Sequence, residues 1–347
     1  MLRGRTVLAV SGLALVAMAL AAPGTAWSVA RETPPAPPQH PGGRAALPMP
    51  TSALLPGTTC RAFPADSFWH ADVSRLPVNV RSAQWIGHMQ GSTRRLHADF
   101  GPSFGAQPVP YGIPITVVHG ATRVPVTFDY ADESDKVRYP LGASTLIEGG
   151  SGASGDRHAI VVDASTCQLF ETWDTRRNAS GWHAGSGAVW SLTSDALRPA
   201  GWTSSDAAGL PILPGLLRYD EVAAGHVDHA IRFTTDVTDR TYVWPARHQA
   251  GSVSDHSYPP MGARFRLSAA YPITSFSKQA QVVLRAMKTY GLVLADNGSP
   301  WFFQGTSDTR WQSSLVSELG RVPASAFQAV DTAPLRISAS SGAAKRL

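Results

Sequence analysis

The stretch Ala159 to Trp173, AIVVDASTCQLFETW, decides the fold. It contains two short apolar runs separated by three small or polar residues, which together predict a β-hairpin. Because side chains alternate across a strand, His158 is expected on the same face as Ile160, and Glu171 on the same face as Leu169. Glu171 then lies among apolar neighbours. Its carboxyl group either reaches solvent at the rim or has its pKa raised by desolvation, as a general acid near neutral pH requires.

The longer stretch from Leu146 to Trp190 surrounds this hairpin with titratable and aromatic side chains in glycine-rich loops. We therefore predict the functional site there, with further contributions from two flanking segments. The predicted catalytic residues are Glu148, Asp156, His158 and Glu171. The predicted substrate-binding residues are His97, Asp99, Arg157, Trp182, His183, Trp190 and Trp202.

Each of these residues also has a purely structural interpretation. Glu148 precedes two glycines and can simply cap a loop, and Asp156 with Arg157 can form a surface ion pair worth under about 1 kcal/mol. His97 and Asp99 would share a face on a strand, but a surface turn is the preferred interpretation. With ten tryptophans in the chain, core filling is the default for any one of them.

The two ends of the chain are predicted to lie outside the folded domain. Residues 1–26 join basic side chains to an apolar run and then to small residues, which is the pattern of a secretory signal peptide. Residues 27–59 contain eight prolines and predict a linker, because proline disfavours regular helix and central strand. Residues 60–335 are then one domain, and residues 336–347 a disordered tail. The protein is expected to be secreted, without stable membrane insertion.

Cysteine content and charge limit the chemistry further. Cys60 and Cys167 predict one disulfide in an exported protein, with two buried free thiols as the alternative. The net charge of +5 suits an acidic partner or an anionic envelope, but the basic residues are scattered, which argues against nucleic-acid binding. No nucleotide-binding glycine loop, CxxC pair or HExxH motif occurs, so neither cofactor nor metal is predicted.

One acidic segment has the composition of a calcium site. Four carboxylates lie between Asp129 and Asp135, and calcium prefers such oxygen ligands. The segment lacks the glycine and the trailing glutamate of an EF-hand loop, so a solvated acidic turn is the preferred interpretation.

The rest of the chain alternates short strand patterns with turns rich in glycine and proline. The predicted strands beyond the hairpin are 113–118, 124–130, 230–235, 241–244, 263–267, 292–295 and 301–303. The predicted helices are 81–89, 277–290 and 310–319. These elements predict an all-β fold, a jelly-roll-like β-sandwich with two or three peripheral helices.

Several segments carry a family resemblance. They are Ile147–Asp163, Gly181–Trp190, Leu197–Glu221, Pro259–Leu267 and Met287–Ser299. They are similar to segments of a family of exported bacterial β-rich proteins to which we attach no activity. The resemblance covers nearly all of residues 63–332 and implies a single domain outside the cytoplasm. It assigns no catalytic residue.

A secreted, tryptophan-rich β-protein with carboxyl groups among apolar neighbours suggests a monomeric enzyme that acts on an extracellular polysaccharide. The leading hypothesis is a glycoside hydrolase in which two of Glu148, Asp156 and Glu171 act as general acid and as base or nucleophile. The alternative is a polysaccharide lyase, with a base such as His158, His97 or Tyr219 and an arginine that neutralises a uronate. A non-catalytic carbohydrate or cell-envelope binding module is the third possibility. All three rest on analogy at the level of the fold.

Overall fold

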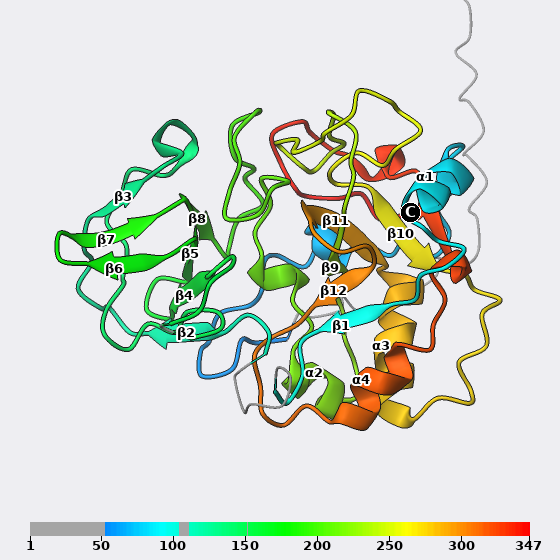
Figure 1. Cartoon of the computed structure of the whole chain (residues 1–347), viewed down its shortest axis with the longest axis horizontal. Coiled ribbons are helices and arrows are strands. Elements are labelled where there is room, and N and C mark those ends of the chain that lie inside the picture. The colour runs from blue at the N-terminus through cyan, green and yellow to red at the C-terminus, as the bar shows by residue number, and fades with distance from the viewer. Residues whose placement is uncertain (1–52, 104–110, 151) are drawn as a thin grey trace, which may run out of the picture. The chain divides into compact units, whose positions relative to one another are not determined.

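The predicted hairpin forms the middle of a four-stranded sheet in the computed structural model, which describes residues 53–103, 111–150 and 152–347 (Figure 1). Its strands β4 (Ala159–Asp163) and β5 (Gln168–Trp173) pair in antiparallel orientation. Strand β2 (Ile115–Val118) adds parallel to β4, and β8 (Ser186–Ser191) adds antiparallel to β5. The hairpin prediction is confirmed.

The two faces of this sheet pack into different hydrophobic clusters. Ile160 and Leu169 belong to one cluster, whereas Val161 and Phe170 belong to the other. The alternation expected from the sequence is therefore present. Glu171 follows Leu169 by two residues, so it points to the same face, and it is fully buried.

A six-stranded mixed sheet forms the second part of the fold, in the order β1-β12-β9-β11-β10-β13. Pairs β1–β12 and β9–β11 are parallel, and the other pairs are antiparallel. The strands are β1 (His97–Asp99), β9 (Ile231–Thr235), β10 (Arg264–Leu267), β11 (Leu292–Asn297), β12 (Phe302–Gln304) and β13 (Phe327–Val330).

A small third sheet has the order β3-β7-β6. It consists of β3 (Val126–Phe128), β6 (Arg176–Asn178) and β7 (Gly181–Ala184). Strands β3 and β7 are parallel, and β6 and β7 form an antiparallel pair.

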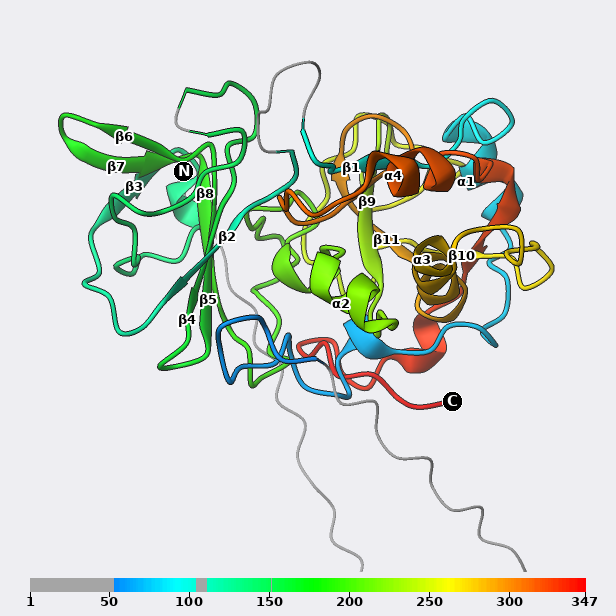
Figure 2. The same cartoon turned by 90° about the horizontal axis from the view of Figure 1, so that it is seen from below.

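Four α-helices occur in the described residues, and both views show them beside the six-stranded sheet (Figures 1 and 2). They are α1 (Ser82–His88), α2 (Tyr219–Ala224), α3 (Lys278–Thr289) and α4 (Ser313–Leu319). Helix α3 begins as predicted, because the Ser277 side chain accepts a hydrogen bond from the Ala280 N–H. Gly291 follows this helix with a positive φ of 75°.

The fold class is confirmed only in its coarse form. The chain is strand-rich, but the helices and the mixed sheets mean that all-β describes it only in part. Parallel neighbours need crossover connections, and the pattern within a single strand does not reveal which neighbour it will pair with. The segment 241–244, predicted to be a strand, makes only an isolated bridge between Tyr242 and Met261.

The ends of the chain differ from the sequence prediction in one respect. The predicted signal peptide and most of the predicted linker lie outside the described residues. Residues 336–347, predicted to be a disordered tail, are instead held against the domain. The Trp244 indole N–H donates to the Ser341 carbonyl at 2.8 Å, and the Ala344 N–H donates to the Asp66 carbonyl at 2.7 Å. The described residues all belong to one compact unit.

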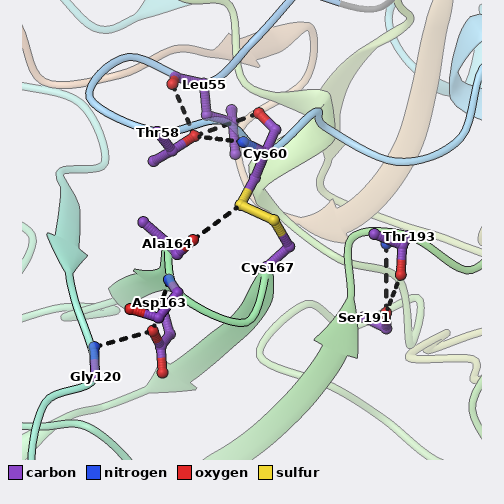
Figure 3. The surroundings of a disulfide bond; sticks show 10 residues. Leu55, Thr58, Cys60, Gly120, Asp163, Ala164, Cys167, Ser191 and Thr193 are labelled. Atoms are coloured by element: carbon purple, nitrogen blue, oxygen red, sulfur yellow. Dashed lines mark hydrogen bonds between the residues drawn. A yellow bond between two sulfur atoms is a disulfide. The ribbon is translucent and has the colours of Figure 1, made fainter.

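The predicted disulfide between Cys60 and Cys167 is present, with a Cα–Cα distance of 5.5 Å (Figure 3). It ties the turn from Leu55 to Cys60 to the connection between β4 and β5. Among the described residues, no helix is both long and apolar enough to cross a membrane.

Candidate functional site

A buried polar cluster connects the four-stranded sheet with the six-stranded sheet. From the first sheet come Glu171 of β5, His158 immediately before β4, and Glu148 of the preceding loop; from the second come Arg232 of β9 and Asp296 of β11. The loop after β8 adds Asp206. We call these six residues the inter-sheet cluster. Their charges act on one another, since the pKa of Glu171 responds to both Arg232 and His158.

His158 is a buried, doubly hydrogen-bonded residue. Its Nδ1 lies 2.7 Å from Glu148 Oε2, and its Nε2 lies 3.1 Å from the Ser205 carbonyl oxygen. Both partners are acceptors, so both ring nitrogens must donate, as in the imidazolium form. Burial alone would lower the pKa of His158, but the Glu148 carboxylate outweighs it and raises this pKa to about 9.

Arg232 is the second cation, and it is fully buried. Its Nε lies 3.2 Å from Asp206 Oδ2, and its Nη2 lies 3.1 Å from Asp206 Oδ1. The same Nη2 lies 3.5 Å from Asp296 Oδ2. The guanidinium group therefore holds two carboxyl groups on one side of the six-stranded sheet. Burial raises the pKa of Asp206 in spite of this partner.

Glu148 and Asp296 are the members of the cluster that reach solvent. Their side chains are 25% and 24% exposed, whereas His158 and Arg232 are almost completely covered. Burial and the neighbouring Asp206 carboxylate raise the pKa of Asp296 to about 7. Burial acts the same way on Glu148, but the charge and hydrogen bonds of His158 outweigh it and lower the Glu148 pKa. The pKa values of these two partly exposed carboxyl groups are thus shifted in opposite directions.

Glu171, a predicted catalytic residue, has no exposed surface. Its two carboxyl oxygens accept hydrogen bonds from the backbone N–H groups of Ile212 and Leu213, at 2.8 to 3.0 Å. Burial raises its pKa to about 6, although these hydrogen bonds oppose the shift. Its position favours a supporting role, fixing the chain that follows the Asp206 loop.

Several buried polar atoms near the cluster have no hydrogen-bond partner among the described residues. They include Arg232 Nη1, Ser205 Oγ and Gln304 Oε1. Gln304 lies next to Arg232, because Phe303 of β12 pairs with Phe233 of β9 in antiparallel register. Each unpaired group costs about 1–3 kcal/mol unless water or a ligand satisfies it, so their concentration here marks a place for polar occupants.

Asp99 and Tyr111 extend this polar region along the sheet. Asp99 pairs with Gln304 in the β1–β12 ladder, and it accepts a 2.8 Å hydrogen bond from the Tyr111 hydroxyl. Burial and the charges of Asp99 and Glu148 raise the pKa of Tyr111 above its ordinary range. His97 shares strand β1 with Asp99, rather than the preferred turn, and stacks on Phe302 with ring centres 3.9 Å apart.

Asp156 and Arg157 do not form the surface ion pair considered from the sequence. Asp156 is exposed, accepts a 3.3 Å hydrogen bond from the Trp173 indole N–H, and raises the pKa of both His158 and Asp296. Arg157 is buried, and its guanidinium group donates to backbone carbonyls of neighbouring loops. Asp156 thus belongs to the rim of the inter-sheet cluster, while Arg157 supports the loop.

The remaining predicted substrate-binding residues lie apart from the inter-sheet cluster. His183 Nε2 lies 3.2 Å from Asp129 Oδ1, and Trp182 packs with the small sheet. Trp190 is buried in the core. Trp202 is half-buried beneath the Arg198 guanidinium, 5.4 Å from its ring centre. Among the described residues, the hydrogen bonds, ion pairs and ring contacts of these four side chains go to other partners.

Open space and aromatic surface lie beside the cluster. A surface pocket of about 290 Å³ is lined by Ile147 and Gly149, on either side of Glu148, and by Ser307 among others. Trp173 contacts both Asp156 and Tyr130, and the ring centres of Trp173 and Tyr130 are 6.2 Å apart. Tyr130 is 54% exposed, so this aromatic pair can meet a ligand.

The acidic segment 129–135 sends its carboxylates to separate partners. Asp135 forms an ion pair with Arg198, Asp132 faces Lys136, and Asp129 faces His183. In the part of the chain that the structure describes, no group of three or more histidine, cysteine or acidic side chains is placed to hold a metal ion.

Half of the inter-sheet cluster was missed in the sequence. Arg232 alternates with Ile231 and Phe233 in a strand, and a charged side chain between buried ones was the signal. Asp296 lies just beyond the strand predicted over 292–295, but β11 continues through it after a register shift between Leu294 and Asp296. Asp206 lies in the loop after β8, outside every predicted strand and helix. No family model, curated protein or solved structure matches the chain.

Proposed function

We propose that the protein is a glycoside hydrolase in which Asp296 is the general acid and Glu148 is the base or nucleophile. One observation carries this proposal: Glu148 contacts the buried His158, Asp296 contacts the buried Arg232, the charges of both cations act on both carboxyl groups, and the pKa values of the two carboxyl groups are shifted apart. Separated pKa values are what assign an acid and a base within one site. A protonated Asp296 donates to the leaving oxygen, while an ionised Glu148 acts on water or on the sugar.

His158 and Arg232 serve as positioning residues in this proposal. His158 orients Glu148 through a 2.7 Å hydrogen bond and stabilises its ionised form. Arg232 holds Asp296 and Asp206 through ion pairs, and its full burial strengthens these interactions. The pair Trp173 and Tyr130 offers flat aromatic surface to a sugar ring at the rim.

The same geometry argues against His158 and Tyr111 as the base of a lyase. A lyase needs an unprotonated base, but both nitrogens of His158 are occupied by acceptors and its pKa is about 9. The raised pKa of Tyr111 makes the phenolate form rarer, not commoner. Neither residue is therefore available as a base near neutral pH.

The finer architecture and the location of the protein are part of the proposal. Polar residues from the four- and six-stranded sheets meet in the inter-sheet cluster, which suits a sandwich-like scaffold, although parallel pairs distinguish it from an antiparallel jelly roll. A secreted monomer acting on an extracellular polysaccharide suits the signal-peptide pattern of residues 1–26 and the disulfide. The resemblance to exported bacterial β-rich proteins points the same way.

Incubation of the purified protein with a panel of polysaccharides tests this function. New reducing ends without absorbance from unsaturated sugars are the expected result. Glu148→Gln and Asp296→Asn should each lower kcat by about 100-fold or more, the usual contribution of an acid or base. Asp132→Asn is the matched control, because Asp132 is fully exposed and faces only Lys136.

Three results would contradict the assignment. Unsaturated products would indicate a lyase, and binding without product would indicate a binding module. Full activity in both Glu148→Gln and Asp296→Asn would move the chemistry away from the inter-sheet cluster.

A further inference from the structure

We infer that a second pocket, beside strand β2, binds the N-acyl group of an amino sugar, which names the substrate class and rests on the proposed function. This pocket has a volume of about 160 Å³. It shares the lining residues Ile115 and Ser307 with the pocket next to Glu148, so the two pockets adjoin. A glycan bound at Glu148 can therefore extend from the first pocket into the second.

Arg218 supplies this pocket with a hydrogen-bond donor that lacks an acceptor. The backbone is extended at Leu216 and Arg218, so these two side chains point to the same side, opposite to Leu217. Leu216 belongs to the hydrophobic cluster of Leu55 and Val162, and these two residues line the pocket together with Arg218. Arg218 is only 4% exposed, and its Nη1 has no hydrogen-bond partner among the described residues. A ligand oxygen in the pocket would satisfy this donor.

The charges around the pocket favour a neutral acceptor. The charged side chains that line it, or pair with those that do, are Arg218, His229, Arg310, Glu221, Asp220 and Asp308. Positive and negative charges are equal in number if His229 is protonated, and the negative ones exceed by one if it is neutral. An anionic group would therefore meet only cations that already have carboxylate partners. A carbonyl oxygen accepts from Arg218 without adding charge.

The rest of the wall favours a short acyl group. It is aliphatic and is formed by Leu55, Pro56, Ile115, Val117 and Val162. A cavity of about 150 Å³ holds a benzene molecule, so this pocket has room for a short acyl group. The carbonyl oxygen of an acetamido group would accept from Arg218 while its methyl group covers the aliphatic wall, which a sugar hydroxyl cannot do. The hydroxyl groups of Thr306 and Ser307 can accept from the amide N–H.

The test compares β-1,4 tetrasaccharides of N-acetylglucosamine, glucosamine and glucose. Methyl glycosides of the same three sugars make the comparison independent of the linkage. Calorimetry with the wild-type protein measures binding, and a reducing-end assay on the tetrasaccharide samples measures cleavage. We expect each N-acetylglucosamine ligand to bind about tenfold more tightly than its glucose and glucosamine counterparts, because only the acetamido group gives Arg218 a carbonyl acceptor.

Two variants locate the acyl group. Arg218→Lys keeps a positive charge beside Glu221 but removes Nη1, so the preference for N-acetylglucosamine over glucose should fall about tenfold. Val117→Phe fills the pocket with a larger side chain, so the N-acetylglucosamine affinity should fall about tenfold. Val137→Phe is the matched control, because Val137 is 48% exposed and lines neither pocket. Urea denaturation of each variant checks that the fold is retained.

The outcomes separate this inference from the proposed function. Glucose or glucosamine ligands that bind as tightly as the N-acetylglucosamine ligands overturn the inference even if sugars are cleaved. A preference that survives in both Arg218→Lys and Val117→Phe overturns it as well. Binding of N-acetylglucosamine ligands without cleavage of any tetrasaccharide rejects the hydrolase and leaves the inference standing. Absence of binding to all six ligands overturns the inference.

Discussion

The carboxyl group of Glu171 is held by hydrogen bonds from the backbone. Both oxygens accept hydrogen bonds from the N–H groups of Ile212 and Leu213, and no part of the side chain is exposed. Burial nevertheless raises its pKa from 4.5 to about 6. The charged form therefore remains costly in the folded state, and folding stability must depend on the protonation of this group.

The first prediction concerns that dependence. Because the folded-state pKa of Glu171 is raised, its protonated form favours folding below the unfolded-state pKa, and this contribution is lost as the pH rises through about 6. The free energy of unfolding should fall by about 2 kcal/mol more in the wild type than in Glu171→Gln between acid and neutral pH. Urea denaturation at several pH values measures the difference. Parallel pH curves for the two proteins would disprove it.

A second prediction concerns the pH dependence of activity. If Asp296 is the general acid, kcat falls as the pH rises through about 7, where this carboxyl group loses its proton. The Asp156 carboxylate contributes to the raised pKa of Asp296. Asp156→Asn should therefore move the falling limb of the profile to lower pH, while Asp132→Asn should leave it in place. If the falling limb of the pH profile does not move in Asp156→Asn, the ionisation of Asp296 does not control kcat.

The sequence showed part of this site because part of it is local. Glu148, His158 and Glu171 lie within one hairpin and its preceding loop, and strand alternation placed two of them on the inner face. Asp296 and Arg232 come from strands that pair through long-range contacts, with a bulge that sets the direction of Asp296. Local patterns carry no information on such a bulge.

At the level of elements, the connection from β7 to β8 packs closely against the ring of Trp173, the aromatic residue at the rim of the inter-sheet cluster. Gly185 lies in this connection, and a Cβ atom there would be 2.2 Å from Cε3 of Trp173. The Trp173 ring also donates a hydrogen bond to Asp156. A side chain as small as alanine must therefore displace the ring and break its contact with the rim of the inter-sheet cluster.

Gly185→Ala is the third prediction. We expect a loss of about 1–3 kcal/mol of stability from overpacking, together with a changed tryptophan emission spectrum. Glycan affinity should fall more than kcat, since Trp173 contacts neither Glu148 nor Asp296. Gly142→Ala is the matched control, because a Cβ atom at Gly142 meets no atom within 4 Å. Equal stability and emission in the two variants would contradict the placement of Trp173.

Elements with strong local patterns were predicted best. The hairpin and helices α1 and α3 have clear periodicity, and α3 also has a serine cap and a terminal glycine. Helix α2 and strand β13 were missed, because each is short and depends on packing into the core rather than on its own sequence.

For the whole molecule, the contacts between residues far apart in the sequence determine which features could be predicted from the sequence. The Cys60–Cys167 pair was predictable by elimination, since the chain has only two cysteines. The mixed order β1-β12-β9-β11-β10-β13 was not, because its neighbours are far apart in the sequence. Residues 336–347 were misjudged for the same reason, as their small and polar composition conceals hydrogen bonds to distant segments.

The disulfide supplies the last prediction, on the stability of the whole domain. It links residues 107 positions apart, so it restricts the unfolded chain over a long loop. Replacing both cysteines by serine should lower the free energy of unfolding by about 2–5 kcal/mol, as loss of a native disulfide usually does. Urea denaturation of the wild type with and without reductant should show the same loss, and reductant should not affect the double variant. Equal stability of the oxidised wild type and the double variant would mean that packing of the Leu55–Cys60 turn, not the bond, fixes this end of the domain.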